Sequence, residues 1–327
     1  MAQWQWQWQW RSATATALMT VGALAGAQGF PNKPVRLVVT FPPGGGADII
    51  GRTLAQKLAE PLGQQVIVEN RPGANGNIGT EFVARSAPDG YTLVVGNTGP
   101  LCISPAIYRG IPYNTANDFA PVSLVASTPI ILVAHPSLPV RSIGDVVRLA
   151  KARPGELHFA SSGNGATSHL SGEMLKTLAK VDMVHVPYKG VAPAIVDVIA
   201  GQVQLQFIDV SVVVGHIKAG KVRAIAWAGA KRGPAFPDVP TVAESGFPGF
   251  EVTGWYGVLA PAGTPKDVVG RLNGALVKVM GQTDTRERFD AIGSIPVTST
   301  PEEFATYLRS ELAKWAGVAK AANLKVD

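Results

Sequence analysis

Residues 34–48 read PVRLVVTFPPGGGAD and decide the fold class. The first half of this stretch is apolar and rich in β-branched residues, which predicts a buried strand. Two prolines and three glycines then end the strand, because proline lacks a backbone N–H donor and glycine favours turns. The next segment repeats apolar residues at the spacing of one helix face, at Ile50, Leu54 and Leu58. The stretch therefore predicts a strand, a glycine-rich loop and a helix in succession.

The same alternation of strands and helices continues along the chain. Apolar segments at 66–68 and 92–95 predict two further strands, with a helix at 78–84 between them. This order is typical of a parallel sheet that helices cover on both faces. A second run of the same kind starts near residue 136. In its segment 203–207, apolar residues alternate with glutamines, which predicts a strand with one apolar face and a polar face that includes Gln206.

Two further apolar segments, 129–134 and 255–260, bracket the second run. If both are strands that connect two lobes, the chain enters the second lobe once and returns once. We therefore expect an α/β protein of two lobes with a ligand cleft between them, since ligands of such sheets bind at strand ends. The expected division is lobe 1 at 28–131 and 250–327, and lobe 2 at 132–249.

Composition excludes several classes of protein. The 327 residues are 46% apolar and 16% charged, which is typical of a folded globular chain rather than a disordered one. The single cysteine, Cys102, excludes an intramolecular disulfide framework and any multi-cysteine metal site. The net charge of +6 is scattered without a Lys/Arg run, so we expect no nucleic-acid partner. The histidines lack metal-ligand spacing, and we expect no metal and no cofactor.

The N-terminal segment has the features of an export signal. Residues 13–27 are small, apolar and uncharged, and they end in Ala25-Gly26-Ala27, an A-x-A cleavage pattern. We expect residues 1–27 to be a signal peptide and the mature chain to be a soluble periplasmic protein. The alternating Trp and Gln before this segment belong either to an unusual leader or to a misplaced start.

The glycine-rich loop at 41–48 is the first candidate binding site. Consecutive glycines let backbone N–H groups converge, and the following helix adds the positive end of its dipole, so an anion is favoured there. The loop is neither a P-loop nor a G-x-G-x-x-G dinucleotide motif. The alternative is a structural turn in which Asp48 caps the helix.

A second loop, at 161–168, reads SSGNGATS between a predicted strand and helix. Its hydroxyls, its amide and its backbone N–H groups suit a carboxylate held by neutral donors. The alternative is an ordinary capped strand–helix turn. A third loop, at 96–100, is a weaker candidate of the same kind.

A serine hydrolase is the catalytic alternative. It would use Ser162 as nucleophile and His169 as base, but Ser162 lacks the G-x-S-x-G context of an esterase elbow. His169 could instead orient the loop or be a buried structural histidine.

Several motifs resemble those of one family, the substrate-binding proteins of tripartite tricarboxylate transporters, often called Bug receptors. The resemblance runs from about residue 31 to residue 326. Its motifs are PVRLVV at 34–39, FPPGGG at 41–46, VENRPGA at 68–74, APDGYTL at 87–93, DFAPV at 118–122, VPYKG at 186–190, FPDVPT at 236–241 and WYGVLAPAGTP at 255–265. Each motif is weak by itself, but their order along the chain is specific.

The resemblance implies a type II periplasmic binding protein fold and capture of a small carboxylated solute between the lobes. It also implies delivery to membrane transporter subunits, with a sensor that signals through another protein as the alternative. We expect a monomer that is not an enzyme. Carried over position by position, the ligand-binding residues are Phe41, Gly45, Gly46, Ala47, Asp48, Thr98, Ser161, Ser162, Asn164, Ala166, Thr167 and Asp209.

Overall fold

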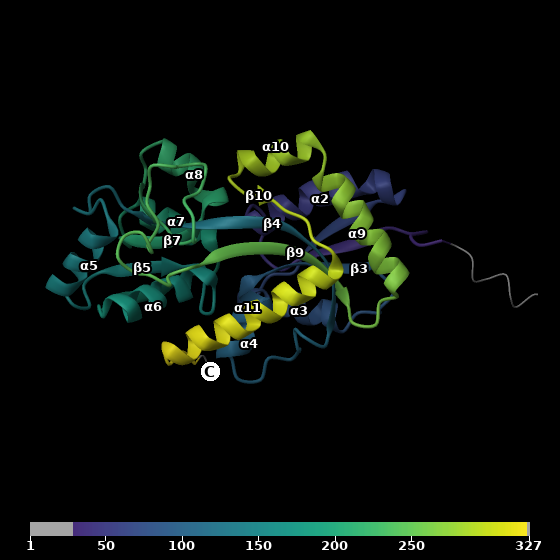
Figure 1. The fold of residues 1–327 in the computed structure, drawn as a ribbon, viewed down its shortest axis with the longest axis horizontal. Coiled ribbons are helices and arrows are strands. Elements are labelled where there is room, and N and C mark those ends of the chain that lie inside the picture. Colours follow the sequence, from purple (N-terminus) through teal and green to yellow (C-terminus); the bar gives the residue numbers. More distant parts are fainter. Residues whose placement is uncertain (1–28, 326–327) are drawn as a thin grey trace, which may run out of the picture.

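A computed structural model describes residues 29–325 as two α/β lobes side by side (Figure 1). The predicted signal peptide, residues 1–27, lies outside the described residues. Within the described part of the chain, no helix is both long enough and apolar enough to cross a membrane. The predicted first strand, loop and helix are confirmed as β1 (Val35–Val39) and α2 (Gly46–Leu62), with the loop between them. The predicted apolar face of α2 is buried, at Ile50, Leu54 and Leu58.

The sheet of the first lobe has the strand order β2-β1-β3-β9-β4, and the short β10 also pairs with β4. Strand β1 is parallel to both β2 and β3, whereas β9 is antiparallel to β3 and to β4. The parallel pairs follow from the strand–helix alternation that the sequence predicted. The strand bounds are β2 (Val66–Asn70), β3 (Thr92–Asn97), β4 (Phe119–Ala134), β9 (Thr253–Pro261) and β10 (Ile295–Pro296).

The sheet of the second lobe continues from the far half of β4 in the order β4-β7-β5-β6, with β8 also on β4. Strand β5 is parallel to β6 and β7, and β4 is antiparallel to β7 and β8. The strand bounds are β5 (His158–Ser161), β6 (Val184–Pro187), β7 (Leu205–Asp209) and β8 (Arg223–Trp227).

The chain crosses between the lobes in two places. Strand β4 changes partners between Pro129, which pairs with β9, and Ile130, which pairs with β7. The second crossing lies just before β9, where the Val252 N–H donates to the Ala228 carbonyl at 2.8 Å. The predicted two-lobed fold is confirmed, but segment 255–260 lies within the sheet of the first lobe rather than between the lobes. The expected residue boundaries of the lobes stay a prediction.

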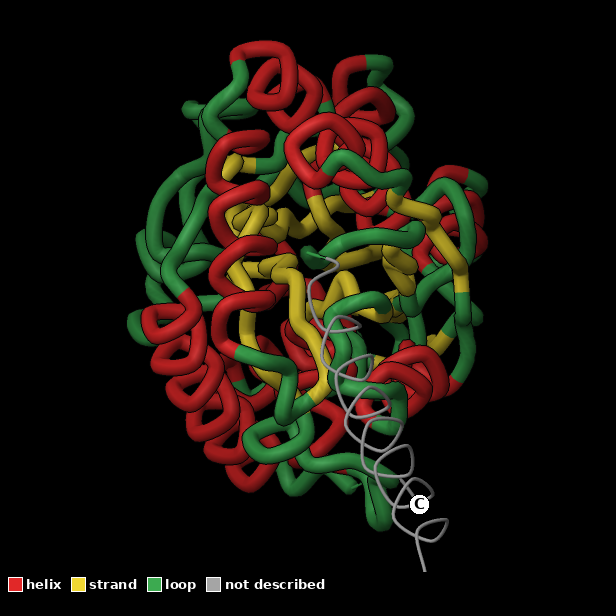
Figure 2. The backbone as a smooth tube through the Cα atoms, turned by 90° about the vertical axis from the view of Figure 1, so that its right-hand side faces the viewer, coloured by secondary structure: helices red, strands yellow, loops and turns green. Residues whose placement is uncertain are grey.

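Helices surround both sheets, so the strands run through the middle of the molecule (Figure 2). In Figure 1, α5 to α8 gather around one lobe, while α2, α3 and α9 gather around the other. The remaining helix bounds are α3 (Asn77–Ala84), α4 (Ser104–Ile107), α5 (Ile143–Ala152), α6 (Thr167–Ala179), α7 (Val191–Ile199), α8 (Val210–Lys218), α9 (Lys266–Met280), α10 (Thr283–Ala291) and α11 (Pro301–Ala321), with short helical turns η1 (Ala74–Gly76) and η2 (Gly99–Ile103).

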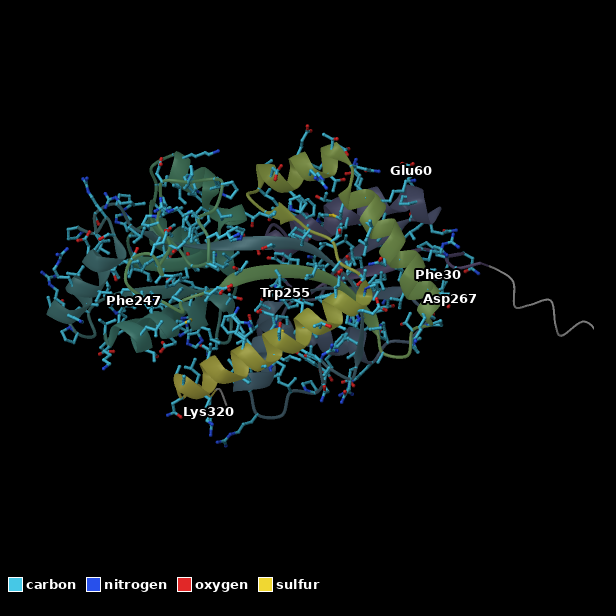
Figure 3. The ribbon with its side chains drawn as sticks, in the orientation of Figure 1. Phe30, Glu60, Phe247, Trp255, Asp267 and Lys320 are labelled. Atoms are coloured by element: carbon cyan, nitrogen blue, oxygen red, sulfur yellow. The ribbon has the colours of Figure 1, made fainter. Side chains whose placement is uncertain are left out.

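Helix α11 packs along β4 and also reaches α6 of the second lobe. The helix begins with a capping box at Thr300, in which the Glu303 side chain accepts from the Thr300 N–H. Farther along, the buried carboxylate of Glu311 accepts from the indole N–H groups of Trp255 at 3.1 Å and Trp315 at 3.0 Å. The bond from Trp255 joins β9 to α11 at the junction of the lobes, where Figure 3 labels Trp255.

The contact between β9 and α11 gives a test of the fold. A Cβ atom on Gly257 would lie 2.3 Å from Cζ of the fully buried Phe304 ring. Gly257→Ala should therefore reduce the free energy of unfolding by ~1–3 kcal/mol, the usual cost of overpacking a core. Gly317 lies in the exposed part of α11, where a Cβ atom would meet nothing within 4 Å. The control Gly317→Ala should therefore increase the free energy of unfolding by ~0.5–1 kcal/mol. Urea denaturation measures both, and equal stabilities of wild type and Gly257→Ala would contradict the packing.

Candidate functional site

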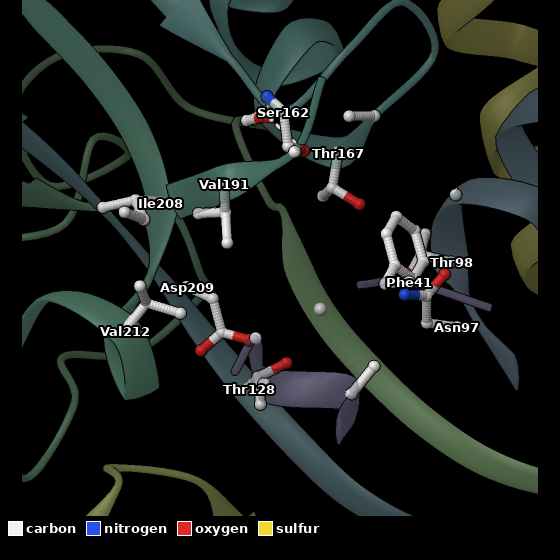
Figure 4. Close-up of a pocket in the computed structure, with 18 of the residues that line it drawn as sticks. Phe41, Asn97, Thr98, Thr128, Ser162, Thr167, Val191, Ile208, Asp209 and Val212 are labelled. Atoms are coloured by element: carbon white, nitrogen blue, oxygen red, sulfur yellow. Dashed lines mark hydrogen bonds between the residues drawn. The ribbon is translucent and has the colours of Figure 1, made fainter. Parts of the chain in front are cut away.

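A cavity of ≈ 190 Å³ lies between the lobes. It is lined by the segments that follow β1 and β3 in one lobe and β5, β6 and β7 in the other. These are the carboxyl ends of the parallel strands, where open α/β sheets bind their ligands. Figure 4 shows Phe41, Asn97 and Thr98 on one side of this cavity and Ser162, Thr167 and Val191 from the other lobe.

The cavity brings together most of the residues that the sequence singled out. Those that line it are Phe41, Gly45, Gly46, Ala47, Thr98, Ser162, Ala166, Thr167 and Asp209. Three others, Asp48, Ser161 and Asn164, are not among the lining residues, and each has another place in the structure.

On the side of the first lobe, the cavity meets the N-terminus of α2. Its N-cap, Gly45, supplies no side-chain hydrogen bond to the first turn, so the N–H groups of Gly46 and Ala47 have no partner within the helix. Gly46 also lies close to Ser211 and Asp209 of the second lobe. A Cβ atom there would lie 3.0 Å from Tyr256 Oη and 3.4 Å from Asp209 Oδ2, so a side chain larger than hydrogen would crowd this contact.

Asp48 points away from the cavity and holds the loop. Its carboxylate accepts from the Gly44 N–H at 3.0 Å, from Arg52 Nε at 2.9 Å and from Asn70 Nδ2 at 2.9 Å. Burial alone would raise the pKa of Asp48, but these hydrogen bonds outweigh burial and lower it below its ordinary value. The predicted alternative, in which Asp48 caps α2, is wrong, because the N-cap is Gly45 and no side chain caps the first turn. The carboxylate of Asp48 instead stabilises the loop before α2.

On the side of the second lobe, two more helix N-termini meet the cavity. Neither Ala166, the N-cap of α6, nor Gly190, the N-cap of α7, supplies a side-chain hydrogen bond to its helix. The N-terminus of α8 differs, because its N-cap Asp209 accepts from the Ser211 N–H at 2.9 Å. Burial raises the pKa of Asp209, although that hydrogen bond acts in the opposite direction.

Ser161 and Asn164 support the loop at 161–168 rather than line the cavity. Ser161 is fully buried, with Oγ 2.6 Å from His185 Nε2. The exposed Asn164 accepts, through its carbonyl, the Tyr108 hydroxyl of the first lobe at 2.9 Å. The first contact secures the base of the loop, and the second joins it to the other lobe.

Two stacked histidines lie beneath this loop. The rings of His169 and His185 are 3.8 Å apart between centroids and nearly parallel, at 9°. Burial lowers the pKa of His169 to about 4, and burial together with its neighbour lowers the pKa of His185 to about 3. Both rings are therefore neutral at neutral pH, and Nδ1 of His169 accepts the Gly165 N–H at 3.2 Å. His169 thus orients the loop, one of the two roles considered for it.

The contacts of a Ser162–His169 hydrolase are not formed. Oγ of Ser162 lies 3.3 Å from Oγ of Ser168, while His169 is engaged with Gly165. Ser161, the serine of this loop that contacts a histidine ring, is fully buried and outside the cavity lining. Within residues 29–325, no group of three His, Cys, Asp or Glu side chains could hold a metal ion.

The structure also places polar residues in the cavity that the sequence did not single out. Asn75, Thr128 and Gln206 all line it, beside Asn97 of the third candidate loop at 96–100. Both amide atoms of Asn75 and of Gln206 are buried without a hydrogen-bond partner, as are Thr98 Oγ1 and Asn97 Oδ1. Gln206 lies on the face of β7 that the sequence predicted to be polar, yet it is fully buried. Helix α6 packs against one face of β7 and α7 against the other, so that neither face is open to solvent.

Two α/β lobes joined by two crossings, with helix N-termini from both lobes at one cavity, define a bilobal ligand-binding protein. The chain belongs to the tripartite tricarboxylate transporter family receptors (TctC), whose family model matches residues 50–324. Members of this family are periplasmic solute-binding receptors, as the motifs in the sequence indicated.

Named relatives agree with this membership. Protein BugT of Bordetella pertussis is 38% identical over 309 residues, which cover 94% of each chain. The structure of R. palustris Rpa4515 with adipate has 37% identity and a TM-score of 0.87, covering 90% of this chain and 99% of that one. The structure of MatC from Rhodopseudomonas palustris with bound malate has 34% identity and a TM-score of 0.83, and the match covers 88% of this chain and 99% of that one.

The structural place of Asp48 gives a test that separates stability from binding. Asp48→Ala removes one acceptor shared by three donors, so the free energy of unfolding should fall by ~1–3 kcal/mol at neutral pH. Because the pKa of Asp48 is lowered on folding, its contribution is present above its ordinary pKa of 3.8 and is lost as the pH falls through the lowered value. In thermal melts, the difference in stability between wild type and Asp48→Ala should therefore shrink at acidic pH. A stable variant that has lost ligand affinity would show instead that Asp48 contacts the ligand.

Proposed function

We propose that this protein is a periplasmic receptor that closes its two lobes over a small organic carboxylate and delivers it to a tripartite membrane transporter. One observation carries the proposal: the N-termini of α2, α6 and α7, none capped by a side chain, line a single cavity. Each such terminus carries about half a positive charge and free N–H donors, which favour an anion.

Carboxylate is the anion that fits this cavity best. The charged side chains among its described lining residues are one cation, Lys189, and one carboxylate, Asp209. The other polar groups are neutral hydroxyls and amides, which suit a group of low charge better than a phosphate. The adipate and malate found in the two similar structures agree with this inference.

Closure of the lobes would be coupled to binding. The lobes already touch through the Tyr108–Asn164 hydrogen bond and through Gly46, which packs near Asp209. A ligand held by α2 in one lobe and by α6 in the other stabilises the closed state through contacts that exist only in that state. Such a receptor needs no covalent chemistry, and we propose that it acts as a monomer.

The family membership and the predicted signal peptide support delivery to a transporter and location in the periplasm. The closed receptor would present both lobes to transporter subunits at once. Uptake of the identified ligand by cells with and without the gene tests this step.

Ligand binding is tested by titration calorimetry and thermal shift with a panel of mono-, di- and hydroxycarboxylates. At least one free acid should bind and raise the melting temperature, while its methyl ester should not. Thr98→Val keeps the shape of a buried side chain but removes a hydroxyl without a partner, so it should weaken binding about tenfold. A folded protein that ignores every carboxylate, or that binds the esters equally well, would refute the proposal.

Lobe closure is tested by a pair of glycine variants. Gly46→Ala places a Cβ within 3.0–3.4 Å of Tyr256, Ser211 and Asp209 and should disfavour the closed state, weakening binding about tenfold. Gly215→Ala is the control, because Gly215 is exposed on α8 outside the cavity lining and its Cβ would meet nothing within 4 Å. Calorimetry with the identified ligand compares them. Equal affinities for both variants would mean that closure at Gly46 is not part of binding.

A further inference from the structure

One contact between the lobes lies outside the cavity. The hydroxyl of Tyr108, which directly follows α4 in the first lobe, donates to the Asn164 carbonyl of the second lobe at 2.9 Å. Tyr108 is half-buried, and burial raises the pKa of its hydroxyl, so this group keeps its proton and remains a donor at neutral pH. Tyr108 is not among the lining residues of the cavity. The contact is therefore made by protein groups alone, beside the cavity rather than in it.

Gly165 brings the same loop of the second lobe against α4. Its φ is +76°, in the left-handed region that favours glycine. A Cβ atom there would lie 2.7 Å from Ile107 Cδ1 and 3.1 Å from Tyr108 Cε2, so side chains of the first lobe pack directly on this backbone. The buried Ile107 belongs to the same apolar cluster as Leu170 of α6. A hydrogen bond and an apolar contact therefore hold the two lobes together at this loop.

The loop that Tyr108 contacts leads directly into α6. Within its own lobe the loop is fixed, because the Gly165 N–H donates to Nδ1 of the buried His169 at 3.2 Å. The next residue, Ala166, is the N-cap of α6 and lines the cavity. Because the loop is fixed on its own side, a contact to it from the first lobe sets the distance between the N-termini of α2 and α6.

We propose that Tyr108 is a positioning residue that holds the two lobes partly closed before a ligand binds. This inference rests on lobe closure as part of the proposed function. A receptor whose binding-competent state makes up only a fraction of the ligand-free population has its affinity reduced by that fraction. The Tyr108 hydrogen bond raises the closed fraction, because it forms only when the lobes are together. Tyr108 thus increases affinity for the ligand without contacting it.

The first test measures the distance between the lobes in the ligand-free protein. Spin labels at Glu60→Cys on α2 and Lys218→Cys on α8 report this distance, because both positions are exposed and lie in different lobes. The native Cys102 is fully buried and should not react with the label in the folded protein. In pulsed electron paramagnetic resonance, Tyr108→Phe should lower the ratio of closed to open protein about three- to tenfold, the effect of one neutral hydrogen bond. Identical distance distributions for wild type and Tyr108→Phe, or a wild type without a closed population, overturn the proposal.

A second tyrosine supplies the matched control. The Tyr91 hydroxyl donates to Asn32 Oδ1 at 2.9 Å, a bond within the first lobe and outside the cavity lining. Tyr91→Phe removes the same group as Tyr108→Phe and should change neither the distance between the lobes nor the affinity. A lower melting temperature of Tyr108→Phe with unchanged distances and affinities would show that its hydrogen bond is merely structural, and would overturn its positioning role.

The second test measures binding by calorimetry, with succinate and glutarate as the first probes. Tyr108→Phe should weaken every carboxylate that binds wild type by one common factor, the factor by which it lowers the closed fraction. A loss that differs from one carboxylate to the next would show that Tyr108 contacts the ligand, and would overturn the proposal. Failure of every carboxylate to bind wild type refutes the proposed function, whereas the ligand-free distances decide the role of Tyr108 by themselves.

Discussion

The architecture depends on one strand that belongs to two sheets. The near half of β4 pairs with β9, its far half pairs with β7 and β8, and the change occurs between Pro129 and Ile130. Because β4 is antiparallel to its partners in both lobes, the parallel strands of each lobe end at the junction. The loops after β1, β3, β5, β6 and β7 therefore meet there, and the cavity is a consequence of strand direction.

Helix N-termini then decide what the cavity can bind. Small residues, Gly45, Ala166 and Gly190, stand at the N-caps of α2, α6 and α7, so the free N–H groups of these helices are open to a ligand. At α8 the N-cap is Asp209, which occupies the donors itself. In the proposed function, the preference for an anion comes mainly from the backbone, so that a cavity with a single lysine can still attract a carboxylate.

Much of the fold could be predicted from the sequence, because glycine-rich loops after apolar strands are a local signal. The same signal located Gly46, Ser162 and Thr167. It could not decide whether Asp48 points to the ligand or to its own loop, since either is compatible with an acidic residue in a first helical turn. The burial of Gln206 could not be predicted, because alternation alone does not show whether a strand is covered on both faces. Asn75 lines the cavity because distant segments of the chain come together there, and no local sequence pattern predicts such a contact.

The most direct measurement is a crystal structure of the protein with its identified ligand. The account predicts one ligand carboxylate within hydrogen-bond distance of the Gly46 or Ala47 N–H in the first lobe. The same carboxylate should also contact the Thr167 or Ser168 N–H in the second lobe, with the lobes closed around it. A carboxylate held by side chains of one lobe alone, with all three helix N-termini facing solvent, would contradict the account.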